Sequence, residues 1–416
     1  MRDAIDWGSW VAGWTALAFV VIYGIFVVVN TVANHRARRS LDYRILVTGS
    51  RGKSGTVRLV HAALSGQRRV YSKISGAAAR ELRGDGTEID TPRAGTTSVC
   101  ELPQSMRRAA RDNASIGVFE CMAVTPKLIE MVQRVHIQAH MVIIPTIRLD
   151  HLEEEGLTEF EIGKSIFDSI TTADVIVSAV EQPDIIDYYR EQCAKHDIEF
   201  IHVNPKTNHH RVPGHHPTNL ALALRVADYL GVDQQTAIEG LQSVTFEPRA
   251  LSYQSITREN GSVLSLVDIG SANDPQSAWE ALERLQFDSQ VIVPVMVNRW
   301  ERPLRAISFF ATLRQHFSLV GVAGTLGTWM NSRHNQTAYR HSVDHERTDF
   351  FRVTRRMARR PEMLAQDIER RLGRSVDHLV IVLVENNHET TTDLLRKQFD
   401  RDGESLTLEA VEEKVS

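Results

Sequence analysis

The stretch RILVTGSRGKSGTVRLVHAAL (residues 44–64) joins an apolar run to a helical pattern through a short loop with two glycines. The run YRILVT (43–48) predicts a buried strand, and the helical pattern begins at about Lys53. Glycines let backbone N–H groups approach an anion closely, and a helix N-terminus adds donors and a favourable dipole. A glycine-containing turn without a ligand is the alternative. The GKS sequence at a strand–helix junction favours nucleotide binding.

This loop is shorter than the usual phosphate loop, because Val47 stands where that loop needs its first glycine, five residues before Gly52. A contracted phosphate loop is therefore predicted. In it, Lys53 reaches the β- and γ-phosphates of ATP and the Ser54 hydroxyl binds Mg²⁺. The residues expected to bind the nucleotide are Gly49, Ser50, Arg51, Gly52, Lys53, Ser54 and Gly55.

The first 35 residues differ in composition from the rest of the chain. Residues 10–29 (WVAGWTALAFVVIYGIFVVV) include no charge, and a helix of that length spans the roughly 30 Å hydrocarbon core of a bilayer. A buried core helix and a cleaved signal peptide are the alternatives, but a signal peptide has a shorter apolar region after a basic segment. Arg36, Arg38 and Arg39 follow the apolar run, and the positive-inside bias then places the later residues in the cytoplasm. We expect a single-pass membrane anchor with a cytoplasmic catalytic part.

The whole-chain composition is that of a globular protein. Of 416 residues, 42% are hydrophobic and 24% are charged, which leaves room for two domains of usual size. The net charge of −4 gives no reason to expect a nucleic-acid partner. Cys100, Cys121 and Cys193 show neither zinc-ligand nor disulfide spacing, so a reducing compartment is expected.

Apolar runs alternate with helical patterns, which predicts an α/β fold with mostly parallel sheets. The expected strands are 43–48, 116–121, 140–145, 173–178 and 199–203, then 263–269, 290–297, 318–323 and 378–384. We expect three parts: a membrane anchor (1–35), a central ATP-binding domain (36–250) and a C-terminal α/β domain (251–416). The histidine-rich segment 204–219 lacks acidic neighbours, so solvated loop histidines are favoured there over a metal site.

The loop VTGSRGKS (47–54) resembles that of the Mur-ligase superfamily, which comprises ATP-dependent amide ligases of cell-wall and folylpolyglutamate synthesis. The arginine of RGKS, the anchor and ECMAV (120–124) narrow this resemblance to the poly-γ-glutamate synthase ligase family of capsule synthesis, CapB/PgsB. The resemblance covers nearly the whole chain. It implies a Mur-ligase-like central domain with a phosphate loop, followed by a smaller Rossmann-like domain.

Glu120 ends a predicted strand, which is where ligand sites of α/β proteins lie. The superfamily uses the matching glutamate to hold the Mg²⁺ that bridges the β- and γ-phosphates, and helix capping is the alternative role. Asp150-His151 resembles the DH motif of the superfamily, whose histidine binds a second Mg²⁺. The resemblance thus implies Lys53, Glu120 and His151 as catalytic residues, with metal ligands Ser54, Glu120 and His151.

This chain departs from the family after the DH motif, since Glu153 stands where the family usually has aspartate. Other Mur ligases use a carbamylated lysine further on. Lys164 lies near that distance, but an ordinary surface lysine is the favoured interpretation. Near the C-terminus, Asn387-His388 corresponds to a turn of the family without its flanking glycines.

The segment VDIGSANDPQSAWEAL (267–282) resembles the AANDPxS segment of the family. The resemblance implies that Asn273 and Asp274 contact the nucleotide, and a turn that caps the following helix is compatible with that role. Arg249 lies where the superfamily has an arginine that reaches ATP from the domain junction.

Arg299, Arg302 and Arg305 follow a predicted strand at three-residue spacing, which would gather them on one face of a helix. Guanidinium groups bind carboxylates through two parallel hydrogen bonds. Glutamate or a γ-glutamyl polymer is therefore the expected ligand, and a solvated basic helix face is the alternative.

These patterns predict an ATP-dependent ligase that activates a carboxylate as an acyl phosphate and couples it to an amino-acid amine. Glutamate polymerised into poly-γ-glutamate is the expected product. A membrane-tethered ATPase that energises polymer export, a decayed scaffold and a ligase of another amino acid stay open. The resemblance also implies a polytopic membrane subunit and an anchored accessory subunit as partners.

Overall fold

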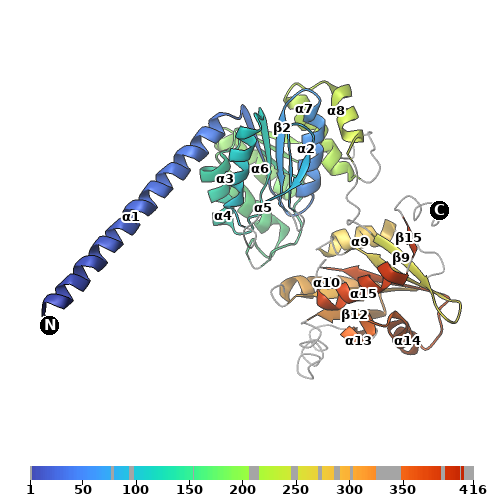
Figure 1. Cartoon of the computed structure of the whole chain (residues 1–416). Coiled ribbons are helices and arrows are strands. Elements are labelled where there is room, and N and C mark those ends of the chain that lie inside the picture. Colours follow the sequence, from blue (N-terminus) through green and yellow to red (C-terminus); the bar gives the residue numbers. More distant parts are fainter. Residues whose placement is uncertain are drawn as a thin grey trace. The chain divides into compact units, whose positions relative to one another are not determined.

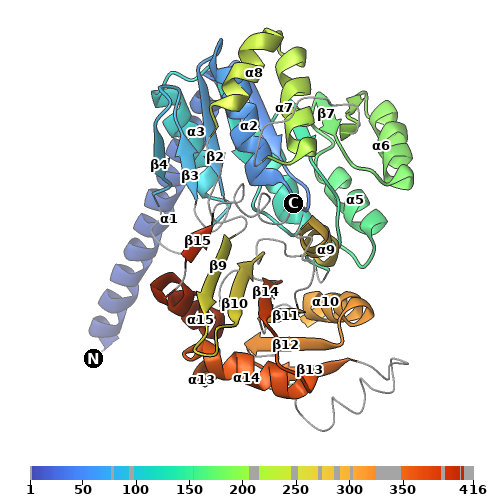
Figure 2. The same ribbon diagram turned by 90° about the vertical axis from the view of Figure 1, so that its right-hand side faces the viewer.

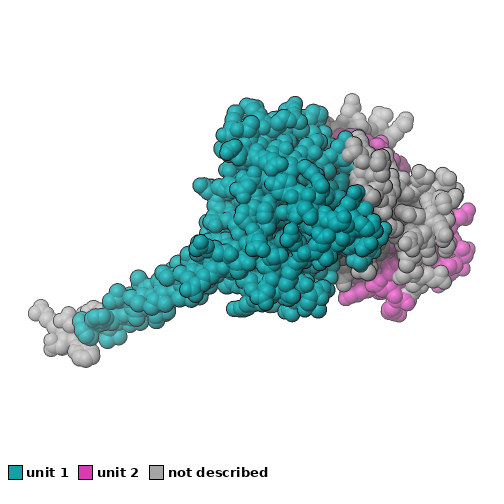
Figure 3. Space-filling model, turned by 90° about the horizontal axis from the view of Figure 1, so that it is seen from above, with its two compact units in different colours: residues 1–147, 159–244 teal, residues 148–158, 245–416 magenta. Residues whose placement is uncertain are grey.

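The computed structural model describes residues 2–75, 79–92, 98–152, 154–205, 215–244, 252–269, 274–284, 291–299, 303–324, 348–385, 389–402 and 404–406. The chain divides into two compact units (Figure 3). Unit 1 comprises residues 1–147 and 159–244, and unit 2 comprises residues 148–158 and 245–416. Each unit contains its own sheet, so the predicted α/β class is confirmed. The division into functional parts at residue 250 stays a prediction.

Unit 1 contains an eight-stranded sheet in the order β4-β3-β2-β5-β1-β6-β7-β8 (Figure 1). Its strands are β1 (Tyr43–Val47), β2 (Val70–Ile74), β3 (Arg80–Leu82), β4 (Glu88–Asp90), β5 (Ile116–Glu120), β6 (Met141–Ile144), β7 (Val175–Ser178) and β8 (Glu199–His202). Six neighbouring strands of this sheet run parallel: β2, β5, β1, β6, β7 and β8. Strands β3 and β4 pair antiparallel at the edge next to β2. The five strands predicted for this half are confirmed.

Unit 1 contains eight α-helices and one π-helix among the described residues. They are α1 (Arg2–Arg39), α2 (Lys53–Ser65), α3 (Glu101–Arg111), α4 (Pro126–Met131), the π-helix η1 (Val132–Ile137), α5 (Glu159–Asp168), α6 (Pro183–Lys195), α7 (Pro217–Tyr229) and α8 (Gln234–Gln242). Helix α2 packs beside α7 and α8 (Figure 2). Its buried residues Val57 and Leu64 share one apolar core with β1 and α7. This core fixes α2, and with it the loop that precedes α2.

Helix α1 projects from unit 1 (Figure 1) and is uninterrupted over 38 residues. Among the described residues, Trp10–Arg39 is the one helix long and apolar enough to cross a membrane. Its apolar side chains are uncovered: Phe19, for example, is 73% exposed. In contrast, Asn34 and Ala37 near its end are buried against the rest of unit 1. Exposed apolar area is unfavourable in water, which fits a segment that lies in lipid.

Unit 2 contains a seven-stranded sheet in the order β13-β12-β11-β14-β10-β9-β15. Its strands are β9 (Ser252–Thr257), β10 (Val263–Asp268), β11 (Val291–Asn298), β12 (Leu319–Gly324), β13 (Asp349–Arg352), β14 (His378–Val384) and β15 (Glu404–Leu406). Its helices are α9 (Pro275–Arg284), α10 (Pro303–His316), α13 (Arg355–Ala358), α14 (Pro361–Leu372) and α15 (Thr390–Asp402). The four strands predicted for this half are confirmed.

Successive residues of β14 enter two different cores, which shows that helices cover both faces of the second sheet. Leu379 and Ile381 pack with α14 and α15 residues, whereas Val380 and Val382 pack with α9 and α10 residues. Side chains alternate between the faces of a strand, so only a continuously apolar strand can serve both cores. That requirement explains the run HLVIVLV in the sequence.

Candidate nucleotide and metal site

The loop 48–52 leaves β1 at the carboxyl edge of the sheet and is fixed against the residues that follow β6. Ser50 N–H donates to Thr146 O over 3.0 Å, and Thr146 Oγ1 donates to Arg51 O over 3.3 Å. Gly49 and Gly52 have φ values of 120° and 81°, which disfavour any residue with a Cβ atom. The loop therefore has the compact, glycine-dependent form that the sequence predicts.

Asn219, in the first turn of α7, packs directly against this loop. A Cβ atom on Gly52 would lie 2.8 Å from Asn219 Oδ1, and one on Gly55 would lie 2.7 Å from Asn219 Nδ2. Thr56 Oγ1 also donates to Asn219 Oδ1 over 3.2 Å. Asn219 thus buttresses the loop and the start of α2, a role that our sequence analysis missed. The one local signal was a polar residue just after Pro217, where a helix begins.

Ser54 and Glu120 meet at the start of α2. Ser54 Oγ lies 3.0 Å from Glu120 Oε1 and 3.1 Å from Oε2. Glu120 is only 4% exposed, and Ser75 N–H donates to its Oε2 over 2.7 Å. The side chain of Lys53 lies over the same loop, with Nζ 2.5 Å from Gly49 O and 3.1 Å from Ser50 O. Two of the three predicted metal ligands, Ser54 and Glu120, therefore meet beside the predicted phosphate lysine.

These oxygens suit a magnesium ion. Mg²⁺ prefers hard oxygen ligands and is usually held by one or two protein carboxylates, with waters and phosphate oxygens completing its shell. Within the described residues no three His, Cys, Asp or Glu side chains form a metal-binding group, so a cage built of protein alone is not expected there. Burial raises the pKa of the neighbouring Cys121 thiol to about 11, so the free thiol stays protonated at neutral pH.

A buried ion pair lies behind Glu120. Lys73 on β2 is fully buried and its Nζ lies 2.9 Å from Glu101 Oε2. The same ammonium donates to Ser75 Oγ over 3.1 Å, and Ser75 Oγ donates to Glu120 O over 3.1 Å. Lys73 thus fixes the residue that orients the carboxylate of Glu120. Sequence reasoning missed Lys73 because a lysine inside an apolar strand carries no motif.

Asp150 and His151 belong to unit 2, whereas Glu120 belongs to unit 1. Asp150 is 4% exposed, and Arg305 Nη2 donates to its Oδ1 over 2.5 Å. His151 has a φ of 51°, and its Nε2 lies 3.6 Å from Asp150 Oδ2. Arg305 therefore orients the DH motif, and a role for His151 as a metal ligand stays a prediction.

The shared face of Arg299, Arg302 and Arg305 was expected only if their segment is helical, and the structure describes Arg299 and Arg305. Helix α10 begins at Pro303, so Arg299, which is exposed, precedes it. Arg305 lies in the helix but is buried beside Asp150. Arg302 lies outside the described residues.

Of the remaining predicted site residues, the structure describes Asp274. Asp274 is buried and accepts a hydrogen bond of 2.8 Å from Ser277 N–H, so it caps the N-terminus of α9. Its contact with a nucleotide stays a prediction. Arg249, Asn273 and the pair 387–388 lie outside the described residues.

Two other sequence hypotheses concern surface residues. Lys164 is half-exposed and forms an i,i+4 ion pair of 2.6 Å with Asp168, as an ordinary surface lysine does. In the segment 204–219, the side chain of His216 accepts a hydrogen bond of 3.3 Å from Thr218 N–H and so caps α7. His209 and His210 lie outside the described residues.

Comparison with known families gives two matches. The model of the Mur ligase middle domain matches residues 47–221, and that of the poly-gamma-glutamate synthase CapB C-terminal domain matches residues 253–401. The first match covers the loop and Glu120 in unit 1, and the second covers most of unit 2.

Two relatives of this chain are both named CapB. Over 305 residues, the chain is 26% identical to the capsule biosynthesis protein CapB of Bacillus anthracis, a match that covers 70% of this chain and 64% of that protein. It is 24% identical over 305 residues to PGA synthase CapB of Bacillus subtilis, covering 70% of this chain and 77% of that one. The match therefore spans just under two thirds of the Bacillus anthracis relative.

Solved structures show the same fold. Folylpolyglutamate synthase of Mycobacterium tuberculosis, complexed with ADP, is 17% identical and has a TM-score of 0.61, covering 90% of this chain and 94% of that one. MurF from Acinetobacter baumannii is 16% identical and has a TM-score of 0.56, covering 89% of this chain and 79% of that one. The expected Mur-ligase-like fold is confirmed.

The glycine of the loop gives a first test. Gly52→Ala is expected to weaken ATP binding by about tenfold or more, because a Cβ atom at positive φ costs roughly 1–2 kcal/mol and also meets Asn219. Isothermal titration with a non-hydrolysable ATP analogue measures this. Gly86→Ala is the matched control: its φ is 84° but nothing lies within 4 Å of the added atom, so affinity should not change. Equal affinity for both variants would contradict the described loop.

The buried ion pair gives a second test. Lys73→Met should lower the free energy of unfolding by about 3–5 kcal/mol, since it leaves the carboxylate of Glu101 buried without its counter-charge. Urea unfolding measures the loss. The double variant Lys73→Met/Glu101→Leu should recover most of it, because an apolar pair needs no charge compensation. A neutral single variant would show that Lys73 is not buried as described.

The pair of Arg305 and Asp150 gives a third test. Arg305→Met should destabilise unit 2 by about 3–5 kcal/mol, because the carboxylate of Asp150 stays buried. Arg299→Met, at an exposed position on the same connection, should change stability by about 0.5 kcal/mol or less. Thermal unfolding of both variants measures the difference. Similar stabilities would argue that Arg305 is available to a substrate instead.

Proposed function

Because the chain belongs to the poly-γ-glutamate synthase CapB family of the Mur-ligase superfamily, we propose that it is an ATP-dependent ligase. It would join a carboxylate to the amine of an amino acid, with glutamate as the monomer and poly-γ-glutamate as the product. The observation that carries this proposal is the meeting of Lys53, Ser54 and Glu120 at the carboxyl ends of β1 and β5. That arrangement suits a nucleotide triphosphate and a divalent cation together.

The residues of the loop bind the nucleotide in this proposal. The backbone N–H groups of the loop and of the first turn of α2 face the phosphates, and the ammonium of Lys53 moves from the loop carbonyls to the β- and γ-phosphates. Ser54 and Glu120 hold Mg²⁺, which supplies positive charge where phosphate charge builds up. Ser75 N–H and Lys73 keep the carboxylate of Glu120 oriented toward Ser54.

The reaction needs a leaving group, because hydroxide leaves a carboxylate poorly. A carboxylate oxygen of the acceptor attacks the γ-phosphorus of ATP, and ADP leaves as the acyl phosphate forms. The amine of the incoming amino acid attacks the acyl carbon, phosphate departs, and the nitrogen loses a proton. Lys53 stabilises the transferred phosphoryl group through its charge, and the loop holds it in line with the carboxylate.

Residues of unit 2 also have roles in this proposal. Arg249, Asn273 and Asp274 contact the nucleotide, and His151 binds a second metal ion. Arg299 and Arg302 bind carboxylates of glutamate or of the γ-glutamyl chain. Arg305 acts through Asp150 as a positioning residue, because its guanidinium is buried beside that carboxylate.

We further propose that α1 anchors the chain in the cell membrane with its catalytic part in the cytoplasm. Its apolar, uncovered span and the arginines at its end support this orientation. A lone helix cannot form an exit path for a polymer. A polytopic membrane subunit and an anchored accessory subunit are therefore the proposed partners, and no nucleic-acid partner is proposed.

Trapping with hydroxylamine tests the chemistry. The full chain in detergent receives Mg-ATP, a short γ-glutamyl oligomer and hydroxylamine, which converts an acyl phosphate into a stable hydroxamate. The wild type should form hydroxamate, and Lys53→Ala should lower its rate by about 100-fold or more, since it removes the charge at the transferred phosphoryl group. Lys195→Ala is the matched control, because that lysine is exposed on α6, where it forms a surface ion pair of 2.7 Å with Glu191.

ATP hydrolysis without hydroxamate, and without dependence on any amino acid, would instead favour the ATPase that energises export. A hydroxamate formed from another amino acid's carboxylate would keep the ligase and change its substrate.

A further inference from the structure

Helix α1 enters unit 1 directly, without a linker. It stays helical to Arg39, and β1 begins at Tyr43. Asn34, the first α1 residue that is buried in unit 1, follows the predicted span end Val29 by about 7–8 Å along the helix axis. That length is about the depth of one headgroup layer. The folded part of unit 1 therefore begins at the membrane surface.

Hydrogen bonds fix the helical segment 126–137, formed by α4 and η1, beside the end of α1. Asn34 Nδ2 donates to His136 O over 3.3 Å, and Arg38 Nη1 donates to the carbonyls of Val135 and His136. Figure 1 shows α3 and α4 on the side of unit 1 from which α1 projects. The segment thus lies at the level where α1 leaves the lipid.

This segment carries exposed apolar side chains and positive charge. Val135 on η1 is 55% exposed, and Leu128 on α4 is 40% exposed. Lys127, which directly precedes Leu128 in the first turn of α4, is also exposed.

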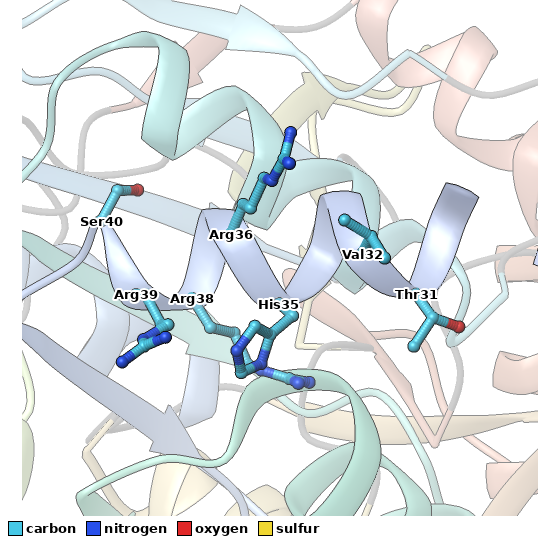
Figure 4. A pocket seen from close by; sticks show the side chains of 7 residues that line it. All are labelled: Thr31, Val32, His35, Arg36, Arg38, Arg39 and Ser40. Carbon is cyan, nitrogen blue, oxygen red and sulfur yellow. The ribbon is translucent and has the colours of Figure 1, made fainter. Parts of the chain in front are cut away.

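The end of α1 itself carries further basic side chains. A hollow of about 630 Å³ there is lined by Thr31, Val32, His35, Arg36, Arg38, Arg39 and Ser40. Figure 4 shows His35, Arg38 and Arg39 directed to one side of the helix and Arg36 to the other. Arg36 and Arg39 are exposed and form no ion pair within the part of the chain that the structure describes.

We propose that the α4–η1 segment and the end of α1 form a docking surface for anionic phospholipid headgroups of the bilayer that α1 spans. Val135 and Leu128 enter the interfacial layer, and Arg36, Arg39 and Lys127 contact lipid phosphates. Apolar insertion beside cations is the pattern of interfacial membrane binding. This inference rests on the proposed membrane anchor, and the occupant is lipid because α1 itself brings the bilayer to this surface.

Fluorescence quenching in vesicles tests this surface. The full chain carries Cys100→Ser, which removes the exposed native thiol, and Val135→Cys labelled with an environment-sensitive fluorophore. A matched probe at Gln235→Cys labels the exposed surface of α8, far from α1 in Figures 1 and 2. Both proteins are reconstituted in phosphatidylcholine vesicles with or without phosphatidylglycerol, with a quencher on the shallow part of the acyl chains. Flotation first establishes that each protein is inserted.

With phosphatidylglycerol, the probe at position 135 should be quenched and blue-shifted, and the probe at 235 should not. Arg36→Gln/Arg39→Gln should lower the quenching at 135 by about half or more, because much of the attraction to anionic lipid is lost. If the chain floats with the vesicles but the probe at position 135 is not quenched, the proposal is overturned, and a protein partner becomes the expected ligand of this surface. Equal quenching with and without phosphatidylglycerol, and with and without the two arginines, would overturn the assigned role of the cations. A chain that does not float would refute the anchor, and this surface with it.

Discussion

The candidate site depends on one buried carboxylate and on the groups that satisfy it. Glu120 ends a buried strand, and a carboxylate in that position is costly unless donors or cations surround it. Ser54 from the first turn of α2 and the N–H of Ser75 at the end of β2 both meet it. The need to satisfy Glu120 therefore brings the ends of β1, β2 and β5 together. A cation bound there would add the charge compensation that these neutral donors do not provide.

In the proposed function, unit 1 also connects this site to the membrane. Helix α1 is continuous with unit 1, and its end is bonded to η1 rather than joined through a flexible linker. Any polymer made at the loop would therefore be produced at a fixed height above the bilayer.

Much of the fold and the local part of the site could be predicted from the sequence. The continuously apolar strands and the loop from Gly49 to Ser54 are set by residues close together in the chain. Strand β2 was missed because Ser72 and Lys73 interrupt its apolar pattern. The pairing of Arg305 with Asp150 joins residues 155 positions apart, and the contacts of Asn219 with Gly52 likewise depend on tertiary packing. A single sequence carries no local signal for such pairs, so their roles came only from the structure.

The central claim is that the chain transfers the γ-phosphoryl group of ATP to a carboxylate. Oxygen-isotope transfer tests it most directly. A γ-glutamyl oligomer labelled with ¹⁸O in its reactive carboxyl group is incubated with the full chain, Mg-ATP and glutamate, and the released phosphate is examined by mass spectrometry. The account predicts one carboxyl oxygen in each phosphate released with amide formation. Amide formation with unlabelled phosphate, or phosphate release that never carries the label, would contradict it.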